Sequence, residues 1–290
     1  MSTPQISIII VNWKVRPLLE KCLESILADT ENFSKEIFVV DNDSRDGTPE
    51  MIMADYHQVT MIALPRNRGF ARANNLALKQ SSGEYIFLLN PDTEIQPGFF
   101  KTILAYFQAH PEVALLGPRI LNSDLSQQAS IRRFPNLISQ LLVLFKLTKI
   151  WPDNKFLQKY LAADFDYNRE QEVEQIMGAA MIMPRATYEK IGLFDQKFFL
   201  WLEEVDYCKR VKDAGLLIKY LPTASLIHHS GISFSKEKIF KKQLIFDWSL
   251  LYYFFKQKNI FQALIILFFL PFNLLLTAGY AWWKNNYQNE

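Results

Sequence analysis

The stretch Tyr85–Ile95, YIFLLNPDTEI, begins as an apolar strand and ends among acidic residues. Its first five residues are aromatic or aliphatic, which is typical of a strand buried in a sheet. Asn90, Pro91 and Asp92 follow without a glycine or a spacer, and Glu94 comes two residues later. If this strand belongs to a parallel sheet, its acidic end lies at the edge where such sheets bind ligands.

Strand and helix patterns alternate on both sides of this stretch. Short apolar runs are separated by segments in which apolar side chains recur every three or four residues. This alternation predicts an α/β fold with a mainly parallel sheet flanked by helices. The predicted strands are 6–13, 36–42, 59–65, 84–90 and 113–121, and the predicted helices are 17–29, 69–81 and 97–109.

The second half of the chain is less regular at first. The stretch 132–174 mixes an amphipathic segment with a polar, aromatic loop, and we interpret it as a loop that meets the acceptor. A strand and a helix are predicted over 174–195, and a further helix over 198–215 that ends at its glycine. Two short strands are predicted over 217–231.

Composition narrows the class of protein. The 290 residues are 49% hydrophobic and 21% charged, which indicates a large apolar core and excludes global disorder. A net charge of +2 gives no support for a nucleic-acid binder, which usually carries a concentrated basic face. The two cysteines, Cys22 and Cys208, have no spacing that suggests a zinc site or a disulfide framework.

Carboxylates follow two of the predicted strands. Asp41 and Asp43 come at the end of one, and Asp92 and Glu94 at the end of another. Any one of these acids could simply cap a turn. Together at one edge they would repel each other, unless a cation or a hydrogen-bonding ligand lies between them. A hard divalent metal that bridges to diphosphate oxygens would satisfy this arrangement.

Six blocks of sequence carry a resemblance to a known family. VVDNDSRDGT, NRGFARANN, LLNPDTEI, GAAMIMPR, FFLWLEEVDYCKR and LIHHSG occur in that order between about Ile6 and Ser233. In order and spacing they resemble family 2 glycosyltransferases of the GT-A fold, and within it the rhamnosyltransferase-like branch. The resemblance implies a GT-A catalytic domain with a nucleotide-binding sheet over residues 1–234. It also implies a nucleotide-diphosphate sugar donor, a glycan or lipid-linked acceptor, Mn²⁺ or Mg²⁺, and inversion at the anomeric carbon.

The same resemblance assigns residues to the donor and the metal. Asp92 is implied to hold the metal, and Asp41 to contact the base or ribose of the nucleotide. Asn90 stands where the family commonly has a second aspartate. His228 is implied as a further metal ligand, and since neighbouring side chains on a strand point to opposite faces, His229 then points away. The donor-binding residues implied by the resemblance are Asn12, Asp41, Asn67, Gly69, Asn75 and Asn90.

A second acidic cluster lies at the start of the helix predicted over 198–215. Glu203, Glu204 and Asp206 are favoured there by the helix dipole alone. Glycosyl transfer with inversion also needs a base that takes the proton of the acceptor hydroxyl. The family pattern places this base at Glu204, with Glu203 and Asp206 as the alternatives.

Two other classes of protein fit the sequence less well. A nucleotide-dependent dehydrogenase needs a glycine-rich turn after the first strand, and the residues there, Val11 to Lys14, contain no glycine. A catalytically inactive homologue that binds sugar or scaffolds other proteins at a membrane is the alternative from another class. The retained acids Asp92 and Glu204 favour the enzyme, and donor hydrolysis without acceptor would separate the two.

The C-terminal segment 235–290 is predicted to be helical, first basic and aromatic and then apolar. Asn259–Trp283 contains no charged residue and is long enough to cross a bilayer. Pro271 divides it into two pieces, so we expect a broken or re-entrant helix that lies in the cytoplasmic leaflet. A clean span and a core or oligomer helix are the alternatives. These features predict a protein on the cytoplasmic face of the cell membrane, held there as a peripheral, monotopic or tail-anchored protein.

Overall fold

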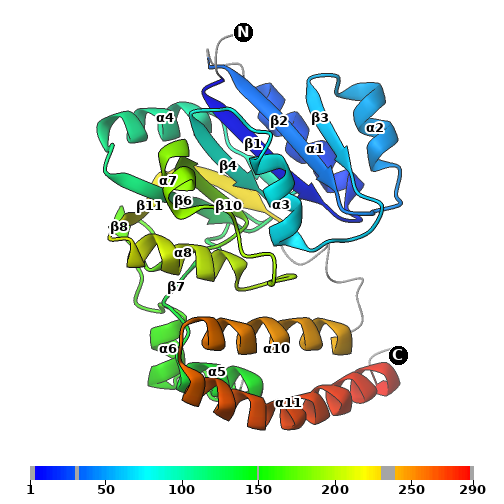
Figure 1. Cartoon of the computed structure of the whole chain (residues 1–290), viewed down its shortest axis with the longest axis vertical. Coiled ribbons are helices and arrows are strands. Elements are labelled where there is room, and N and C mark those ends of the chain that lie inside the picture. Colours follow the sequence, from blue (N-terminus) through cyan, green and yellow to red (C-terminus); the bar gives the residue numbers. More distant parts are fainter. Residues whose placement is uncertain (1–3, 30–32, 149, 230–238, 288–290) are drawn as a thin grey trace.

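The computed structural model describes residues 4–29, 33–148, 150–229 and 239–287, and side chains as far as Trp282. The predicted domain boundary at residue 234, the end of the LIHHSG block and the side chains of Trp283 and Lys284 lie outside this description. Figure 1 shows a sheet covered by helices, with a separate layer of helices below it.

The central sheet has nine strands. Their order is β3-β2-β1-β4-β10-β6-β11-β5, and β8 pairs with β11 beside this path. Six strands run in one direction, while β5, β8 and β10 run against them, so the sheet is mainly parallel as predicted. The strands are β1 (Ile6–Asn12), β2 (Lys35–Asp41), β3 (Val59–Ala63), β4 (Tyr85–Leu89), β5 (Thr93–Ile95), β6 (Val113–Leu121), β8 (Gln171–Glu172), β10 (Ala180–Pro184) and β11 (Leu217–His228). A separate small sheet pairs β7 (Ile131–Arg132) with β9 (Gln175–Ile176).

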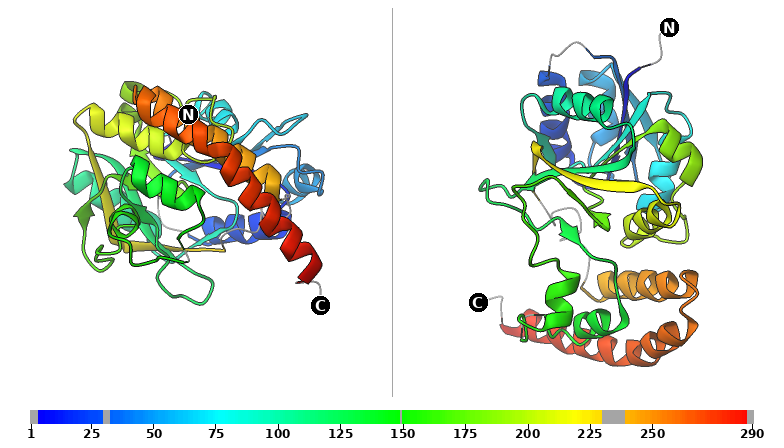
Figure 2. Two further views of the ribbon diagram at one scale, coloured as in Figure 1. Left: turned by 90° about the horizontal axis from the view of Figure 1, so that it is seen from below. Right: turned by 90° about the vertical axis from the view of Figure 1, so that its left-hand side faces the viewer.

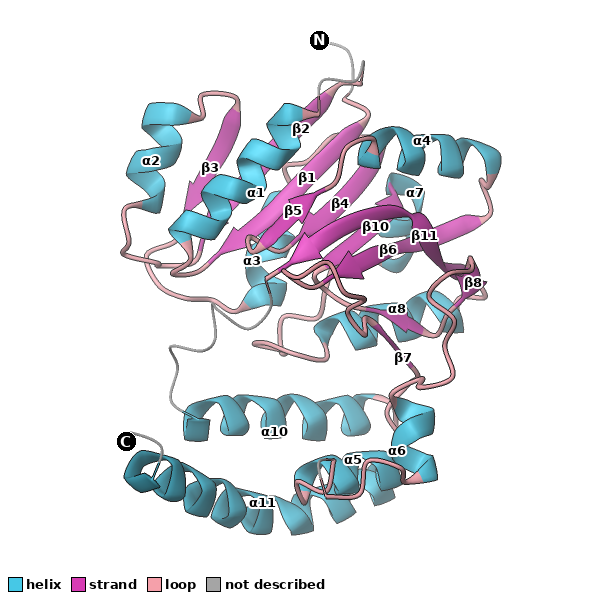
Figure 3. Ribbon diagram, turned by 180° about the vertical axis from the view of Figure 1, so that it is seen from behind, coloured by secondary structure: helices cyan, strands magenta, loops and turns pink. Residues whose placement is uncertain are grey.

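Helices cover both faces of the central sheet. In β1, Ile6, Ile8 and Ile10 pack into one apolar cluster, whereas Ile9 and Val11 pack into the other, as the alternation of a strand requires. The first face carries α1 (Arg16–Ala28), α2 (Thr48–Asp55) and α4 (Phe99–Ala109), seen in front in Figure 3. The second face carries α3 (Phe70–Leu78), α7 (Arg185–Ile191) and α8 (Glu203–Asp213).

Four helices form a layer of their own, which we call the helical base. It consists of α5 (Leu137–Leu144), α6 (Lys155–Tyr160), α10 (Ile239–Lys256) and α11 (Ile260–Tyr287). The base lies below the sheet in Figure 1 and in the right-hand view of Figure 2. The stretch predicted as an acceptor loop therefore contributes two of its helices.

Three local predictions differ from the structure. The helix predicted from residue 198 begins at Glu203, because Trp201 and Leu202 adopt positive φ angles of 65° and 68°. The two strands predicted over 217–231 are one strand, β11, whose pairing with β6 shifts between Leu221 and Ser225. Pro271 does not break α11, which runs through it as one helix and bends along its length in Figure 1.

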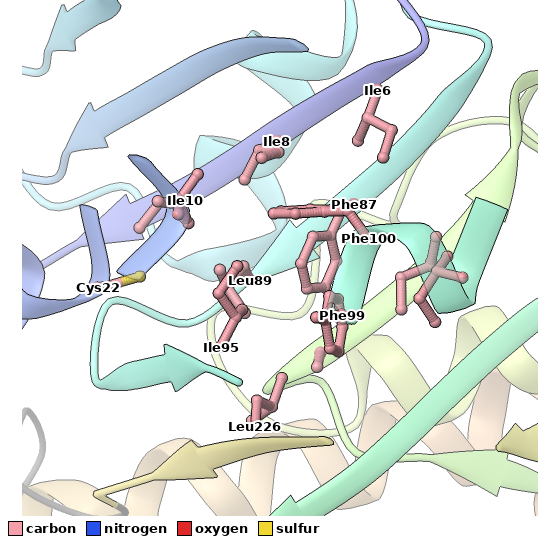
Figure 4. Close-up of a cluster of buried hydrophobic side chains, with 14 of the residues drawn as sticks. Ile6, Ile8, Ile10, Cys22, Phe87, Leu89, Ile95, Phe99, Phe100 and Leu226 are labelled. Carbon is pink, nitrogen blue, oxygen red and sulfur yellow. The ribbon is translucent and has the colours of Figure 1, made fainter. Parts of the chain in front are cut away.

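Aromatic packing beneath β4 anchors the first face of the sheet (Figure 4). The rings of Phe87 and Phe99 stack with centroids 5.4 Å apart, and Phe100 meets Phe87 edge-on. Because β4 ends at Leu89, directly before Asn90, this packing fixes the position of the residues that follow the strand.

Phe99→Ala is expected to lower the free energy of unfolding by about 3–5 kcal/mol, because it leaves a cavity under β4. The matched control is Met53→Ala on α2, where the side chain is 63% exposed and the expected change is below about 0.5 kcal/mol. Urea unfolding of the full chain followed by tryptophan fluorescence measures both. Equal losses in the two variants would contradict this description of the core.

Candidate active site

Three parallel strands end at the same edge of the sheet, as the sequence predicted. Asn12 at the end of β1 lies beside Asp41 at the end of β2, and β4 ends at Leu89, just before Asn90. Two adjoining pockets open at this edge, and they share the residues Phe70, Asn90, Leu200, Trp201 and His228.

We call the first cavity the strand-end pocket and the second the helix-start pocket. The strand-end pocket has a volume of about 230 Å³, and its other lining residues are Val11, Trp13, Asn42, Asn67, Gly69, Pro91, Asp92 and Phe199. The helix-start pocket has a volume of about 340 Å³ and is lined in addition by Ser130, Arg132, Tyr160, Gln175, Ile176, Met177, Gly178, Ala179, Leu202, Glu203, Glu204, Val205 and Phe246.

Asp92 and His228 face each other in the strand-end pocket. The pairing of β5 with β11 sets His228 opposite Thr93, which brings its Nε2 to 3.3 Å from Oδ1 of Asp92. A carboxylate oxygen and an imidazole nitrogen at this separation fit one divalent cation, whose bonds to such ligands are about 2.1 Å long. No third His, Cys, Asp or Glu joins them among the described residues, so phosphate oxygens or water would complete the shell.

His229 points to the other side of the strand. Its Nε2 lies 2.6 Å from Oε1 of Glu94, and its Nδ1 lies 2.7 Å from Oγ of Ser123. The structure thus brings His228 to Asp92, whereas His229 and Glu94 form a pair of their own outside the pocket.

Gln128 orients His228, and nothing in the sequence pointed to it. Its Nε2 donates a hydrogen bond to Oδ1 of Asn122 at 2.7 Å, so its Oε1 faces Nδ1 of His228 at 2.8 Å and accepts a hydrogen bond from the Nδ1–H. This hydrogen bond leaves the Nε2 lone pair of His228 directed at Asp92, the arrangement that a metal-binding histidine needs. Gln128 lies in the loop after β6, far from every acidic motif.

Asp41 and Asn12 lie behind the wall of the strand-end pocket. Asp41 accepts hydrogen bonds from Nδ2 of Asn12 at 3.1 Å and from the backbone N–H of Ser44 at 3.1 Å. These bonds hold the turn that presents the next residue, Asn42, to the pocket. Asn42 is therefore the lining residue at this point of the wall, and it is fixed by a bond from the backbone N–H of Arg68 at 2.7 Å.

The loop before α3 forms the adjoining part of the wall. Gly69 has a φ of +82°, and a Cβ at this position would lie 2.3 Å from the carbonyl oxygen of Phe199, so a side chain is excluded. Oδ1 of Asn67 accepts the N–H of Gly69 at 2.9 Å, which keeps the loop closed. Asn75 is buried on α3 instead, where it exchanges hydrogen bonds of 2.8 and 3.0 Å with the backbone of Phe194.

Two glutamates mark the helix-start pocket. Glu203 is 3% exposed, and its neighbour Glu204 is partly exposed, yet Oε2 of each has no hydrogen-bond partner among the described residues. Burial raises the pKa of Glu203, and the nearby charge of Glu204 raises it further. Burial also raises the pKa of Glu204, while the guanidinium of Arg132 opposes that rise. Carboxyl groups with raised pKa values at a pocket are suited to general acid–base chemistry.

Asp206 has a different place. Its carboxylate is fully buried and forms ion pairs with Nε of Arg210 at 3.0 Å and with Nζ of Lys256 at 2.8 Å. Lys256 also pairs with Asp195 at 2.7 Å. These contacts put Asp206 in the packing of α8 against α10, outside the pocket, and make it a link between the sheet and the helical base.

Comparison with known proteins identifies this α/β fold, with its two adjoining pockets, as a nucleotide-sugar-dependent glycosyltransferase of the GT-A type. The family model described as "Glycosyl transferase family 2" matches residues 7–165, more than half of the chain, so the chain belongs to that family.

Relatives of known function point to the rhamnosyltransferase-like branch. The N-acetylglucosaminyl-diphospho-decaprenol L-rhamnosyltransferase of Mycobacterium tuberculosis is 28% identical over 246 residues, which cover 81% of this chain and 79% of the relative. Rhamnosyltransferase WbbL of Escherichia coli K12 is 23% identical over 237 residues, which cover 77% of this chain and 83% of the relative.

Solved structures agree on the fold. The mannosyltransferase PcManGT of Pyrobaculum calidifontis, in complex with GDP-Man and Mn²⁺, aligns with a TM-score of 0.57 at 17% identity and covers 97% of this chain and 74% of its own. GalNAc-T7 with UDP, GalNAc and Mn²⁺ aligns with a TM-score of 0.59 at 15% identity. The alignment covers 78% of this chain and 44% of the GalNAc-T7 chain.

Glu203→Gln is expected to stabilise the protein increasingly as the pH rises. The carboxyl group of the unfolded chain ionises near its ordinary pKa of 4.5, whereas the folded protein holds the proton to higher pH. The free energy of unfolding of the wild type therefore decreases as the pH rises above 4.5. The full decrease is about 1.4 kcal/mol for each unit by which folding raises the pKa of Glu203, and the glutamine variant does not lose this stability.

Urea unfolding at several pH values from about 5 to about 8 measures this difference in stability. The control is Glu189→Gln, on the exposed side of α7. A gain in Glu203→Gln that does not change with pH, or an equal gain in the control, would show that burial of the Glu203 charge is not its source.

Proposed function

We propose that this protein is an inverting, metal-assisted glycosyltransferase that moves a sugar to a hydroxyl of a glycan or lipid-linked acceptor. The observation that carries the proposal is the placement of Asp92 and His228 in one pocket and of Glu203 and Glu204 in the adjoining one. The donor then lies in the strand-end pocket and the acceptor in the helix-start pocket. The reacting atoms meet at the shared wall.

The residues of the strand-end pocket suit a nucleotide-diphosphate sugar. Asp92 and His228 would hold Mn²⁺ or Mg²⁺, which neutralises charge on the diphosphate when bound. Asn42, Asn67 and Asn90 offer amide groups for hydrogen bonds, and Trp13 offers an aromatic face. Gly69 lets the loop before α3 pack directly on the backbone of Phe199, which shapes this wall of the pocket.

Glu204 is the proposed base. Its carboxylate takes the proton of the acceptor hydroxyl, and the resulting nucleophile attacks the anomeric carbon from the face opposite the leaving diphosphate. A single displacement of this kind inverts the anomeric configuration. Glu203, one residue earlier and more deeply buried, keeps the local charge low because its raised pKa favours the neutral form. Glu203 remains the alternative base.

Two finer points extend the proposal. We propose rhamnose as the first donor sugar to test, because the relatives above and the dTDP-rhamnosyl transferase RfbF of Shigella flexneri carry that sugar in their names. We also propose that residues 1–234 form the catalytic domain, and that 235–290 hold it at the cytoplasmic face of the cell membrane. One described helix, Ile260–Trp282, is long and apolar enough to cross a membrane, with a mean hydropathy of 2.2.

A screen of nucleotide-diphosphate sugars, including dTDP-rhamnose, tests the function directly. One donor should be hydrolysed in the presence of Mn²⁺, and NMR spectra recorded before the released sugar mutarotates should show the inverted anomer. A retained configuration would reject the single displacement. Binding of a donor without any hydrolysis or transfer would instead support the catalytically inactive alternative.

His228→Ala is expected to weaken Mn²⁺ binding in the presence of a nucleoside diphosphate by at least about tenfold, because one of two protein ligands is lost. His229→Ala, its neighbour on the opposite face, is the matched control and should bind Mn²⁺ like the wild type. Electron paramagnetic resonance of free Mn²⁺ measures both affinities. Equal losses, or a loss only in His229→Ala, would contradict the metal assignment.

Glu204→Gln is expected to lower turnover by about a hundredfold or more, since glutamine keeps the shape but cannot accept a proton. Donor affinity should change little, because Glu204 lies in the other pocket. Steady-state transfer rates and donor titration separate the two effects. If Glu203→Gln were inactive and Glu204→Gln active, the base would be Glu203.

A further inference from the structure

The long helix α11 has an inverted distribution of polar and apolar residues. Its buried stripe, which packs on α10 and α5, contains the polar side chains of Asn273 and Thr277. Its opposite stripe is strongly apolar and exposed, with exposed fractions of 60–76% at Phe261, Phe268, Phe272 and Leu275. A helix on the surface of a water-soluble protein has the reverse arrangement.

Buried polar contacts fix α11 in this orientation. Nδ2 of Asn273 lies 2.8 Å from both carboxylate oxygens of Asp247 on α10, and Nε2 of Gln243 donates to Oδ1 of Asp247 at 2.7 Å. Gln243 in turn accepts a hydrogen bond from Lys146, just beyond α5. Rotation of α11 about its axis would break these bonds and leave Asp247 buried without its donors, which is costly. The apolar stripe is thus held outward.

A second segment, distant in sequence, adds to the same surface. The stretch from α5 to α6 exposes large apolar side chains at Ile138, Ile150, Trp151 and Phe156. Figure 2 shows α5 beside α11 on the side of the base away from the sheet, and the rings of Phe145 and Phe269 join them at 5.2 Å. An exposed apolar surface built from two separate segments indicates a partner that covers it.

The charge of the helical base identifies that partner. By sequence, residues 137–163 and 239–287 contain nine lysines, two aspartates and no arginine or glutamate, a net charge of +7. The whole chain carries +2, so the remainder carries −5. Lys146 and Lys256 have partners within the chain, whereas Lys155, Lys159 and Lys258 are exposed. Exposed aromatic and aliphatic side chains together with lysines suit an anionic lipid surface.

We propose that the helical base is a monotopic membrane platform, in which α11, supported by α5 and α6, lies in the plane of one anionic leaflet. This proposal rests on the proposed function and deepens it, because it states how the enzyme reaches a lipid-linked acceptor. A membrane-spanning α11 would have to leave α10, which would expose the buried stripe and separate Asn273 from Asp247. An in-plane helix keeps every one of these contacts.

The platform also explains the position of the helix-start pocket. Tyr160 of α6 and Phe246 of α10 line it together with Arg132 and Glu204, so the pocket lies between the sheet and the base. An acceptor whose lipid part stays in the leaflet would enter between these layers. Its sugar hydroxyl would then reach Glu204 without leaving the membrane surface.

Vesicle flotation of the full chain tests the platform. The variant Phe261→Ser/Phe268→Ser/Phe272→Ser/Leu275→Ser should bind phosphatidylglycerol-containing vesicles at least about a hundredfold more weakly than the wild type, since each lost side chain weakens partitioning on the order of tenfold. Pure phosphatidylcholine vesicles should bind the wild type more weakly. The control Met53→Ser/Leu125→Ser removes equally exposed apolar side chains elsewhere and should float normally.

Donor hydrolysis in detergent is measured on the same samples. Hydrolysis retained with flotation lost supports the platform, and hydrolysis retained with unchanged flotation overturns it. Absence of hydrolysis in the wild type would instead count against the proposed function. If the fourfold variant were a monomer and the wild type a dimer that does not float, a second copy of the chain would be the partner, and the platform would be rejected.

Single cysteines at the two ends of α11 separate in-plane insertion from a span and do not depend on the fourfold variant. Both native cysteines, Cys22 and Cys208, are buried, so Asn259→Cys and Asn285→Cys provide distinct labelling sites. With protein bound to the outside of sealed vesicles, a membrane-impermeant maleimide should label both positions without detergent. Protection of one position until detergent is added would overturn the in-plane arrangement.

Discussion

The pairing of β5 with β11 is the constraint on which the site depends. It sets His228 beside Asp92, although the two residues lie far apart in the sequence, and it sends His229 to the opposite face. Asp92 lies close to this sheet edge because β4, packed on Phe99 and Phe100, ends at Leu89, three residues earlier. The place where the metal and the diphosphate are proposed to bind thus follows from the same packing that holds the sheet together.

The acidic residues near the site fall into two groups, according to whether their carboxylates have partners within the protein. Asp41 and Asp206 are satisfied by hydrogen bonds or ion pairs and hold structure, the first at a turn and the second between α8 and α10. Glu203 and Glu204 each leave a buried oxygen without a partner among the described residues, and burial raises their pKa values. Carboxylate oxygens that line a pocket and have no hydrogen-bond partner are the ones available to accept a proton from a ligand.

The sequence predicted the alternation of strands and helices well, because buried strands and amphipathic helices leave local patterns. It also placed Asn90 and Asp92 just after a strand and Glu203 and Glu204 at the start of a helix, where the two pockets lie. It missed Gln128 and Asn42, because their roles arise from contacts across the fold and leave no local pattern. It assigned Asn75 and Asp206 to the site, although tertiary packing buries both elsewhere. It divided α11 at Pro271, where packing on α10 and α5 keeps one helix.

Anomalous diffraction from crystals grown with Mn²⁺ and a nucleoside diphosphate would test the central claim most directly. The account predicts one Mn²⁺ peak in the strand-end pocket, within bonding distance of Oδ1 of Asp92 and Nε2 of His228, with diphosphate oxygens completing its shell. A peak held instead by Asp41 and Asp43, or by Glu203 and Glu204, would contradict it.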